Sequence, residues 1–131
     1  MKISTRGRYA LEVLCELSKD EFKPLKEITK ELGLSRKYLE SIMTTLTKSG
    51  LLESAYGSKG GYKLARETDK ITIAEVLKAT EGSLSVTPCL EKGANFCEKS
   101  EYCKTLPMWK KLNKLIEDYF SDITISDLKS N

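Results

Sequence analysis

Apolar residues in the first fifty positions recur at intervals of three and four, which is the period of an amphipathic helix. The first such stripe predicts a helix that Ser4 or Thr5 can cap at its N-terminus. Cys15 lies beside this stripe, and we interpret it as a small packing residue rather than a reactive thiol. The apolar positions of this first helix are Tyr9, Ala10, Val13, Leu14 and Leu17.

Two further helical stretches follow in close succession. One covers about 25–32, with Pro24 just before it, where proline is tolerated, and Gly33 after it, as is typical of a helix end. The next begins after Ser35 and closes at Gly50. A helix, a short glycine turn and a second helix form the helix-turn-helix pattern. The apolar stripe of the second helix of this motif is Tyr38, Leu39, Ile42, Met43 and Leu46.

A β-hairpin is predicted directly after this motif. Residues 51–56 and 62–65 have the composition of short strands, and the glycine-rich loop 57–61 joins them. A hairpin in this position makes the wing of a winged helix-turn-helix. A short helix near 74–81 follows, with Thr72 in the position of its cap.

The C-terminal part of the chain predicts one long helix over about 106–120 and a last capped turn over 123–128. The apolar stripe of the long helix is close to a heptad seam, so we expect a partner helix, and in so small a chain the obvious partner is a second copy. The alternative is that this helix packs only on its own domain. The expected dimer interface consists of Leu106, Trp109, Leu112, Leu115, Ile116 and Tyr119.

The amino-acid composition limits the cellular compartment and the kinds of catalysis that we expect for this protein. The chain has 131 residues, four Cys and no His. No apolar run reaches the roughly 20 residues of a membrane span, and the N-terminus lacks the apolar stretch of a signal peptide. We therefore expect a cytoplasmic protein with no membrane partner, in which thiols stay reduced. The absence of His excludes Ser-His, Cys-His and His-metal catalysis within one chain, and we expect that the protein is not an enzyme.

Charge is distributed unevenly along the chain. Residues 1–66 carry 13 Lys and Arg against 8 Asp and Glu, whereas residues 67–131 carry 9 against 11. A basic N-terminal half suits a polyanion, although ordinary solvated surface gives a similar excess. Combined with the helix-turn-helix and the wing, this charge favours binding to double-stranded DNA.

The expected DNA contacts come from three places. A recognition helix enters the major groove with its N-terminal residues near base edges, where Arg, Lys and Glu can contact phosphate, guanine or cytosine. The wing tip would lie at the minor groove, and the start of the first helix could neutralise further phosphates. A phosphate cradle for a nucleotide is disfavoured because no Walker-type lysine-serine pair follows the glycine-rich loop. The predicted contacts are Ser35, Arg36, Lys37, Tyr38 and Glu40 on the recognition helix, Lys59 on the wing, and Lys2, Arg6 and Arg8 near the N-terminus.

Three cysteines, Cys89, Cys97 and Cys103, lie within 15 residues in the one irregular stretch of the chain. Such thiolates can converge on one metal centre, because thiolates favour iron–sulfur clusters and zinc. No pair has the two-residue spacing of a zinc knuckle, which disfavours zinc. Unligated thiols that sense oxidation directly, and a loop without a metal role, are the alternatives.

The whole pattern predicts a mainly α-helical fold with a small β-hairpin wing and a long C-terminal dimerisation helix. We divide the chain into a winged helix-turn-helix DNA-binding domain at 1–81, a cysteine-containing loop at 82–105, and a dimerisation helix with a C-terminal turn at 106–131. A loop of that length in a small protein is usually functional or disordered.

Several segments in a fixed order resemble the Rrf-two family of winged-helix repressors, which includes the iron–sulfur regulator IscR, the nitric oxide sensor NsrR and the cysteine regulator CymR. The resemblance covers nearly the whole chain and implies a homodimer on a near-palindromic operator, joined through the long C-terminal helices. Tyr56 stands where many members carry a wing arginine, so it is a further expected DNA contact that departs from the usual minor-groove chemistry. The matching segments are 1–10, Ser35 with 38–40, 57–64, Ile71-Thr72, Glu81-Gly82 and 123–128.

The resemblance also implies that Cys89, Cys97 and Cys103 hold an iron–sulfur cluster that controls DNA affinity, which makes 82–105 a sensor loop. We expect a 2Fe–2S rather than a 4Fe–4S cluster. Leu106 stands in place of the histidine of the IscR type, and Arg8 in place of the acidic ligand of NsrR-like members. The fourth ligand is therefore open among Glu91, Glu98, Glu101, a solvent molecule and a small thiol. The alternative is a cluster-free regulator that thiol oxidation or a protein partner controls, as in CymR-type members.

Overall fold

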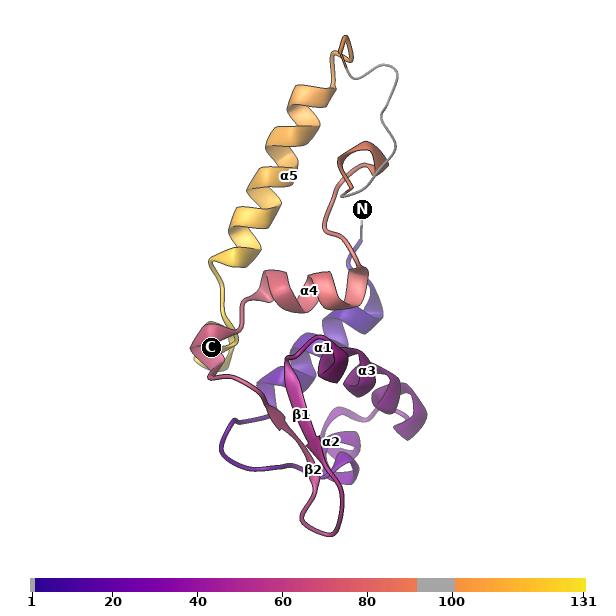
Figure 1. Cartoon of the computed structure of the whole chain (residues 1–131), viewed down its shortest axis with the longest axis vertical. Coiled ribbons are helices and arrows are strands. Elements are labelled where there is room, and N and C mark those ends of the chain that lie inside the picture. The colour runs from indigo at the N-terminus through magenta and orange to yellow at the C-terminus, as the bar shows by residue number, and fades with distance from the viewer. Residues whose placement is uncertain (1, 92–100) are drawn as a thin grey trace.

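The protein is described by a computed structural model that covers residues 2–91 and 101–131. Figure 1 shows a winged-helix body from which one long helix, α5, rises. Within the described residues the elements, in chain order, are α1 (Thr5–Cys15), α2 (Leu25–Leu32), α3 (Arg36–Lys48), β1 (Leu52–Ala55), β2 (Gly61–Leu64), η1 (Thr68–Lys70), α4 (Ile73–Glu81), η2 (Pro88–Leu90), α5 (Leu106–Ser121) and α6 (Ile125–Lys129).

The helices of the body begin and end at the capping residues that the sequence indicates. Ser4 accepts a hydrogen bond from the backbone N–H of Gly7 at 3.0 Å and caps α1. Ser35 accepts one from the N–H of Tyr38 at 3.2 Å and caps α3. Gly33, at φ 66°, closes α2 in the left-handed conformation. The predicted turn between α2 and α3 is therefore confirmed.

One apolar core holds the body together, and α1, α2, α3, the hairpin, α4 and α6 all contribute to it. Burying each large apolar side chain stabilises the fold by about 1.5–3 kcal/mol. The predicted stripes of the first three helices supply much of this core. Its buried members are Ala10, Val13, Leu14, Leu17, Ile28, Leu39, Ile42, Met43, Leu46, Leu51, Leu52, Leu64, Ile71, Ile73, Ala74, Val76, Leu77, Leu84 and Ile125.

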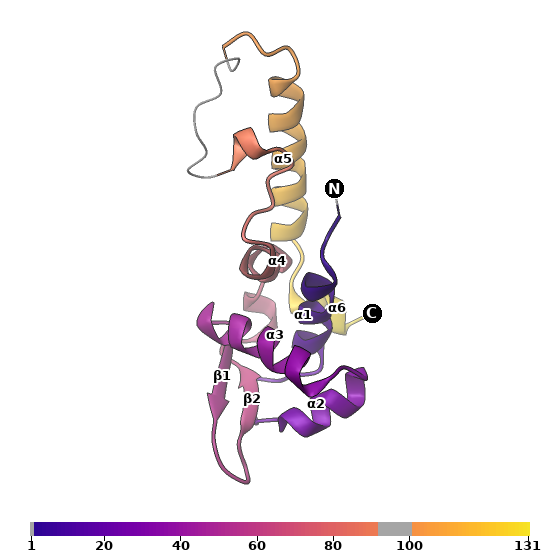
Figure 2. The same cartoon turned by 90° about the vertical axis from the view of Figure 1, so that its right-hand side faces the viewer.

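The wing is an antiparallel hairpin whose register pairs Leu52 with Leu64 and Ala55 with Gly61. Its strands are slightly shorter than 51–56 and 62–65, and the second begins one residue earlier, because Gly61 is already paired. A further bridge joins Tyr62 to Lys23, in the segment before α2. In Figures 1 and 2 the hairpin and α2 lie at the end of the molecule opposite the start of α5.

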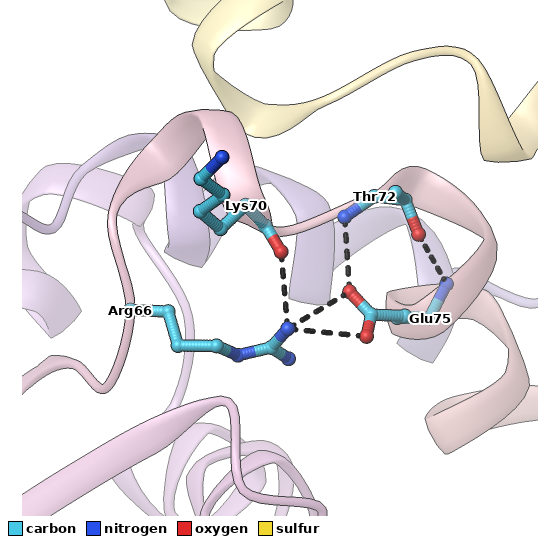
Figure 3. A network of polar contacts seen from close by, with 4 residues as sticks. All are labelled: Arg66, Lys70, Thr72 and Glu75. Carbon is cyan, nitrogen blue, oxygen red and sulfur yellow. Dashed lines mark hydrogen bonds and ion pairs between the residues drawn. The ribbon is translucent and has the colours of Figure 1, made fainter.

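A polar network fixes the connection between the wing and α4 (Figure 3). Thr72 and Glu75 form a reciprocal capping box at the start of α4. Arg66 donates from Nη1 to the Lys70 carbonyl at 3.0 Å and to Glu75 Oε1 at 3.2 Å. The predicted cap at Thr72 is therefore confirmed, and Arg66 anchors it to the end of the hairpin.

The last elements leave the body and return to it. No residue of α5 is buried, and this helix packs on α4. The chain then re-enters the body, where Ile73 N donates to Ile123 O and Ile125 N to Ile71 O, both at 2.9 Å. Lys129 Nζ donates to Leu17 O at 2.7 Å and ties α6 to the end of α1. Within 2–91 and 101–131, no helix is long and apolar enough to cross a membrane.

Candidate nucleic-acid interface and cysteine-bearing segment

The N-terminal turn of α3 presents its polar side chains to solvent. Ser35, Arg36, Lys37 and Glu40 are all exposed. Arg36 Nε pairs with Glu40 Oε1 at 3.1 Å, with 71% and 50% of the two side chains exposed. An exposed pair of this kind is worth about 0.2–1 kcal/mol. Arg36 can therefore exchange this contact for a base edge or a phosphate, and Glu40 can exchange it for a base edge.

Tyr38 lies at the seam between α3 and α1. Its ring meets that of Tyr9 edge-on, with centroids 6.1 Å apart and planes at 79°. Aromatic pairs of this geometry add about 0.5–1.5 kcal/mol beyond the area they bury. The half-buried Tyr38 is thus held at the edge of the exposed surface of α3.

The wing tip presents a tyrosine and a lysine. Tyr56 is fully exposed and Lys59 is exposed beside the turn. In the second strand of the wing, burial raises the pKa of Tyr62, and the carboxylate of Glu40 raises it further. The wing strand β1 packs against α3, so the wing lies beside the recognition helix.

The N-terminal basic residues divide into two groups. Lys2 and Arg8 are exposed, and Arg8 Nη2 donates to Thr5 Oγ1 at 3.1 Å. Arg6 instead turns onto α3, where its guanidinium contacts Ser41 and Thr45. Arg6 was predicted from the sequence as a contact to phosphate, and the structure adds an intramolecular role for its side chain.

Two of the three loop cysteines lie in the described residues, and Cys97 lies outside them, as does Glu98. Cys89 is exposed on η2, with its Sγ 3.1 Å from Thr87 Oγ1, and it forms no disulfide. Cys103 Sγ lies 3.4 Å from Thr105 Oγ1, close to the start of α5. Cysteine sulfur atoms are the donors that iron–sulfur clusters take, so the donor set fits such a group.

Acidic side chains near these thiols are exposed. Both Glu91 and Glu101 face solvent. Within 2–91 and 101–131, no three His, Cys, Asp or Glu side chains are grouped so that they could hold a metal ion. The three-cysteine set includes Cys97, so it extends beyond the residues described.

The segment after α4 is fastened to α5. Val86 N donates to Asn113 Oδ1 at 3.1 Å, and Leu84 is buried in the core. A polar cavity of about 660 Å³ lies between α4, this segment and α5, and Glu81, Glu91 and Glu117 are among its lining residues. The path from the body to Cys89 is therefore ordered by contacts to two helices.

The apolar residues of α5 fall on two faces. Leu106, Trp109 and Ile116 are half-buried and lie on one face. The other face is exposed and repeats at intervals of four, three and four, the spacing of a heptad seam. It consists of Met108, Leu112, Leu115 and Tyr119, whose exposed fractions are 53%, 36%, 58% and 64%. The set predicted from sequence combined residues of both faces and left out Met108.

Cys15 lies half-buried at the end of α1, and burial raises the pKa of its thiol. A raised pKa keeps the thiol in its neutral form at neutral pH, which fits the packing role predicted from sequence.

Glu81 was not among the residues predicted to have a functional role, because its partner Ser4 lies 77 residues away along the chain. No local pattern signals such a contact.

Known proteins with related sequences and folds agree with this architecture. The chain is 34% identical to the HTH-type transcriptional regulator IscR of Vibrio vulnificus over its whole length, which spans 79% of that relative. It is 32% identical to IscR of Erwinia tasmaniensis, of which it spans 80%. Both are named as transcriptional regulators.

Solved structures resemble the whole fold. CymR, the global cysteine regulator of B. subtilis, superposes with a TM-score of 0.79 at 32% identity, covering 99% of this chain and 97% of that one. The oxidized form of Staphylococcus aureus CymR gives 0.77 at 28% identity, covering 100% and 98%. IscR of T. potens gives 0.74 at 31% identity, covering 98% and 85%. The predicted winged helix-turn-helix fold is confirmed.

The profile of the Rrf2 family, described as iron-dependent transcriptional regulators, matches residues 3–131. The resemblance inferred from the sequence motifs is thereby confirmed over almost the entire chain. On the combined evidence of sequence, fold and relatives, the chain belongs to the Rrf2 family and is a DNA-binding transcriptional regulator of the IscR-like type.

Proposed function

We propose that this regulator represses transcription by binding a near-palindromic operator as a homodimer. The N-terminal turn of α3 reads the major groove, and the wing and the first turn of α1 contact the flanking backbone. The exposed polar side chains at the start of α3, which packs against the wing, carry this proposal. The proposed contact residues are Lys2, Arg6, Arg8, Ser35, Arg36, Lys37, Tyr38, Glu40, Tyr56 and Lys59.

The proposed dimer forms through α5. Its exposed apolar face would meet the same face of a second copy, an isologous contact that a two-fold axis generates. Such a dimer sets the distance between the two recognition helices, which must match the half-site spacing of the operator. Residues 1–81 then serve as the DNA-binding domain, 82–105 as the sensor loop and 106–131 as the dimerisation element.

We further propose that Cys89, Cys97 and Cys103 hold an iron–sulfur cluster, of the 2Fe–2S type. The cluster would supply a redox-sensitive group whose iron atoms are bound by the sulfur atoms of these cysteines. Cys89 follows the body, and Cys103 comes shortly before α5. Holding both thiols on one group fixes the junction between the DNA-binding domain and the dimer helix. DNA affinity would then depend on the cluster through the geometry of that junction.

Anaerobic iron–sulfur reconstitution tests this proposal directly. The reconstituted protein should show visible charge-transfer absorption, and a variant with Cys89, Cys97 and Cys103 all changed to Ala should lose it. Operator affinity, measured by fluorescence anisotropy, should differ between the two proteins. Absorption that is the same in the triple variant, or affinity that does not depend on it, would contradict the proposal. Cys15→Ala serves as the control, since Cys15 lies on α1.

A second candidate is a cluster-free regulator that thiol oxidation or a protein partner controls. The similarity to CymR structures, one of them an oxidized form, favours this candidate. It predicts a colourless anaerobic preparation whose operator affinity changes on thiol oxidation or on addition of a co-purifying protein at a fixed ratio. In both candidates the role is regulatory and not catalytic, and we infer that the protein acts in the cytoplasm.

A further inference from the structure

Glu81 joins the last turn of α4 to the first turn of α1. Its Oε1 atom accepts two hydrogen bonds from Ser4, one from the backbone N–H at 3.1 Å and one from the hydroxyl at 2.5 Å. The hydroxyl oxygen of Ser4 in turn accepts the N–H of Gly7. Hydrogen bonds to a carboxylate are about twice as strong as those between neutral groups. The half-buried Glu81 therefore helps to fix the cap of α1.

Gly7 makes this close approach possible. It is buried in α1, and a Cβ at this position would overlap Oε1 of Glu81 and lie 3.2 Å from Thr80 Oγ1. Any larger residue would force the Glu81 carboxylate out of this position and so disturb its hydrogen bonds with Ser4. The contact between α4 and α1 thus depends on the carboxylate of Glu81 in α4 and on the absence of a side chain at Gly7 in α1.

Arg6 connects the same turn of α1 to the recognition helix. Its Nη1 donates to Ser41 Oγ at 2.9 Å, and its Nη2 donates to Ser41 O at 2.9 Å and to Thr45 Oγ1 at 2.5 Å. The planar guanidinium holds two successive turns of α3 in a fixed fork, which a lysine could not reproduce. A displacement of the first turn of α1 would therefore move α3.

On its other side, Glu81 adjoins the segment that carries Cys89. Gly82, at φ 80°, turns the chain, and the segment continues past the buried Leu84 to η2. A small cavity of about 80 Å³ lies at this junction, with Ile3, Glu81 and Ser83 among its lining residues. A shift of the segment that moves Ser83 and Leu84 would be transmitted to Glu81, because only Gly82 separates Glu81 from Ser83.

We propose that Glu81 is a positioning residue that links the cysteine-bearing segment to the recognition helix, acting through Ser4 and Arg6. The series of contacts runs from the segment through Glu81 to the α1 cap, and from Arg6 to Ser41 and Thr45. Rearrangement at the cysteines changes the hydrogen bonds between Ser4 and Glu81, and thereby the position of α3 against DNA. This inference rests on the proposed dependence of DNA affinity on the loop cysteines, and it identifies the route within one subunit.

The test is a double-mutant cycle on operator affinity between Cys89→Ser and Glu81→Gln. For each background, the cysteine response is the ratio of operator affinity with Cys89 intact to that with Cys89→Ser, under the same anaerobic iron–sulfur reconstitution. We expect Glu81→Gln to bring this ratio closer to one by about 2- to 30-fold. A merely structural role of Glu81 would weaken binding by the same factor in both proteins and leave the ratio unchanged.

Glu117→Gln is the matched control. It makes the same change of charge and removes an α4–α5 contact, the ion pair with Lys78 at 3.0 Å, which does not involve α1. Its cysteine response should equal that of the unmodified protein. Arg6→Lys tests the other end of the route with its charge retained, and it should reduce the response as Glu81→Gln does. If the Glu81→Gln variant shows no cooperative thermal transition, Arg6→Lys replaces it in the test.

The outcomes separate the proposed cysteine control from the proposed route. A response of one in the unmodified protein overturns the cysteine control and the route together. A response that differs from one, and that Glu81→Gln and Arg6→Lys leave intact, overturns the route alone. A response reduced equally by Glu117→Gln also overturns it, because the effect would then follow charge rather than the contact with Ser4.

Discussion

Lys23 and Tyr62 exchange two backbone hydrogen bonds, which join the segment before α2 to the second strand of the wing. Lys23 N donates to Tyr62 O at 2.8 Å, and Tyr62 N donates to Lys23 O at 2.9 Å. The second strand of the hairpin is thereby paired on both edges, with β1 on one side and the segment before α2 on the other. The wing cannot swing freely, because this bridge holds it to the helix-turn-helix.

Gly61 should be the glycine at which the wing is least tolerant of substitution. Its φ is 136°, and a Cβ there would overlap the Lys23 carbonyl. Gly57, at φ 100°, has a positive φ but open space around it, so it is the matched control. Backbone strain alone costs about 1–3 kcal/mol. Urea denaturation should show that Gly61→Ala lowers the free energy of unfolding by more than Gly57→Ala. Equal decreases would contradict the role of the bridge.

Removal of the two basic side chains at the start of α3 should weaken operator binding. The double variant Arg36→Ala with Lys37→Ala should also flatten the dependence of log affinity on log salt concentration, by about 0.9 for each phosphate that the protein no longer neutralises. Lys110→Ala with Lys111→Ala removes the same charge from the exposed surface of α5 and is the control. Affinity and slope unchanged in the α3 variant would show that this turn does not face DNA.

The exposed apolar face of α5 should be the dimer contact. Leu115→Glu places a charge on that face, which burial in an interface would strongly disfavour. We expect the dimer dissociation constant in sedimentation experiments to rise about tenfold or more. Lys110→Glu, an acidic substitution at another exposed position of the same helix, should leave the assembly intact. A monomeric unmodified protein, or a Leu115→Glu variant that still dimerises equally well, would rule out this face.

The thiol of Cys15 should reduce stability in alkaline solution. Burial raises its pKa above the ordinary value of 9.0, so the folded state holds this proton to a higher pH than the unfolded chain does. The unfolded state then binds fewer protons, and the free energy of unfolding falls as pH rises above about 9. Cys15→Ala should make that fall shallower in this alkaline range. Tyr62, whose pKa is also raised, is present in both proteins and cancels from the comparison.

The local features of this fold were predictable because each has a signal within a few residues. Ser35 and Gly33 mark the two ends of the turn before the recognition helix, and Thr72 marks the start of α4. The helical period of the apolar residues places Leu39, Ile42 and Leu46 in the core. Caps and periodicity act over one or two turns, so a single sequence is enough to reveal them.

Contacts between distant parts of the chain were not predictable in the same way. Arg6 looks like any exposed basic residue until the fold brings Ser41 beside it. The long helix has two apolar faces, and periodicity alone cannot tell which of them the rest of the fold partly covers. Met108 belongs to the exposed face and Trp109 to the covered one, although they are neighbours in sequence. Only the path of the chain through α4 and α6 decides between them.

The return of the chain at Ile123 has a consequence for how such proteins can diverge. The chain departs at Glu81 and comes back at Ile123, whose carbonyl accepts the N–H of Ile73 at the start of the helix that it left. Both ends of the excursion are therefore clamped to one helix, as the ends of an inserted domain are. An arm attached in this way behaves as an exchangeable cassette, because its length and chemistry can change while the framework that grips its two ends stays the same.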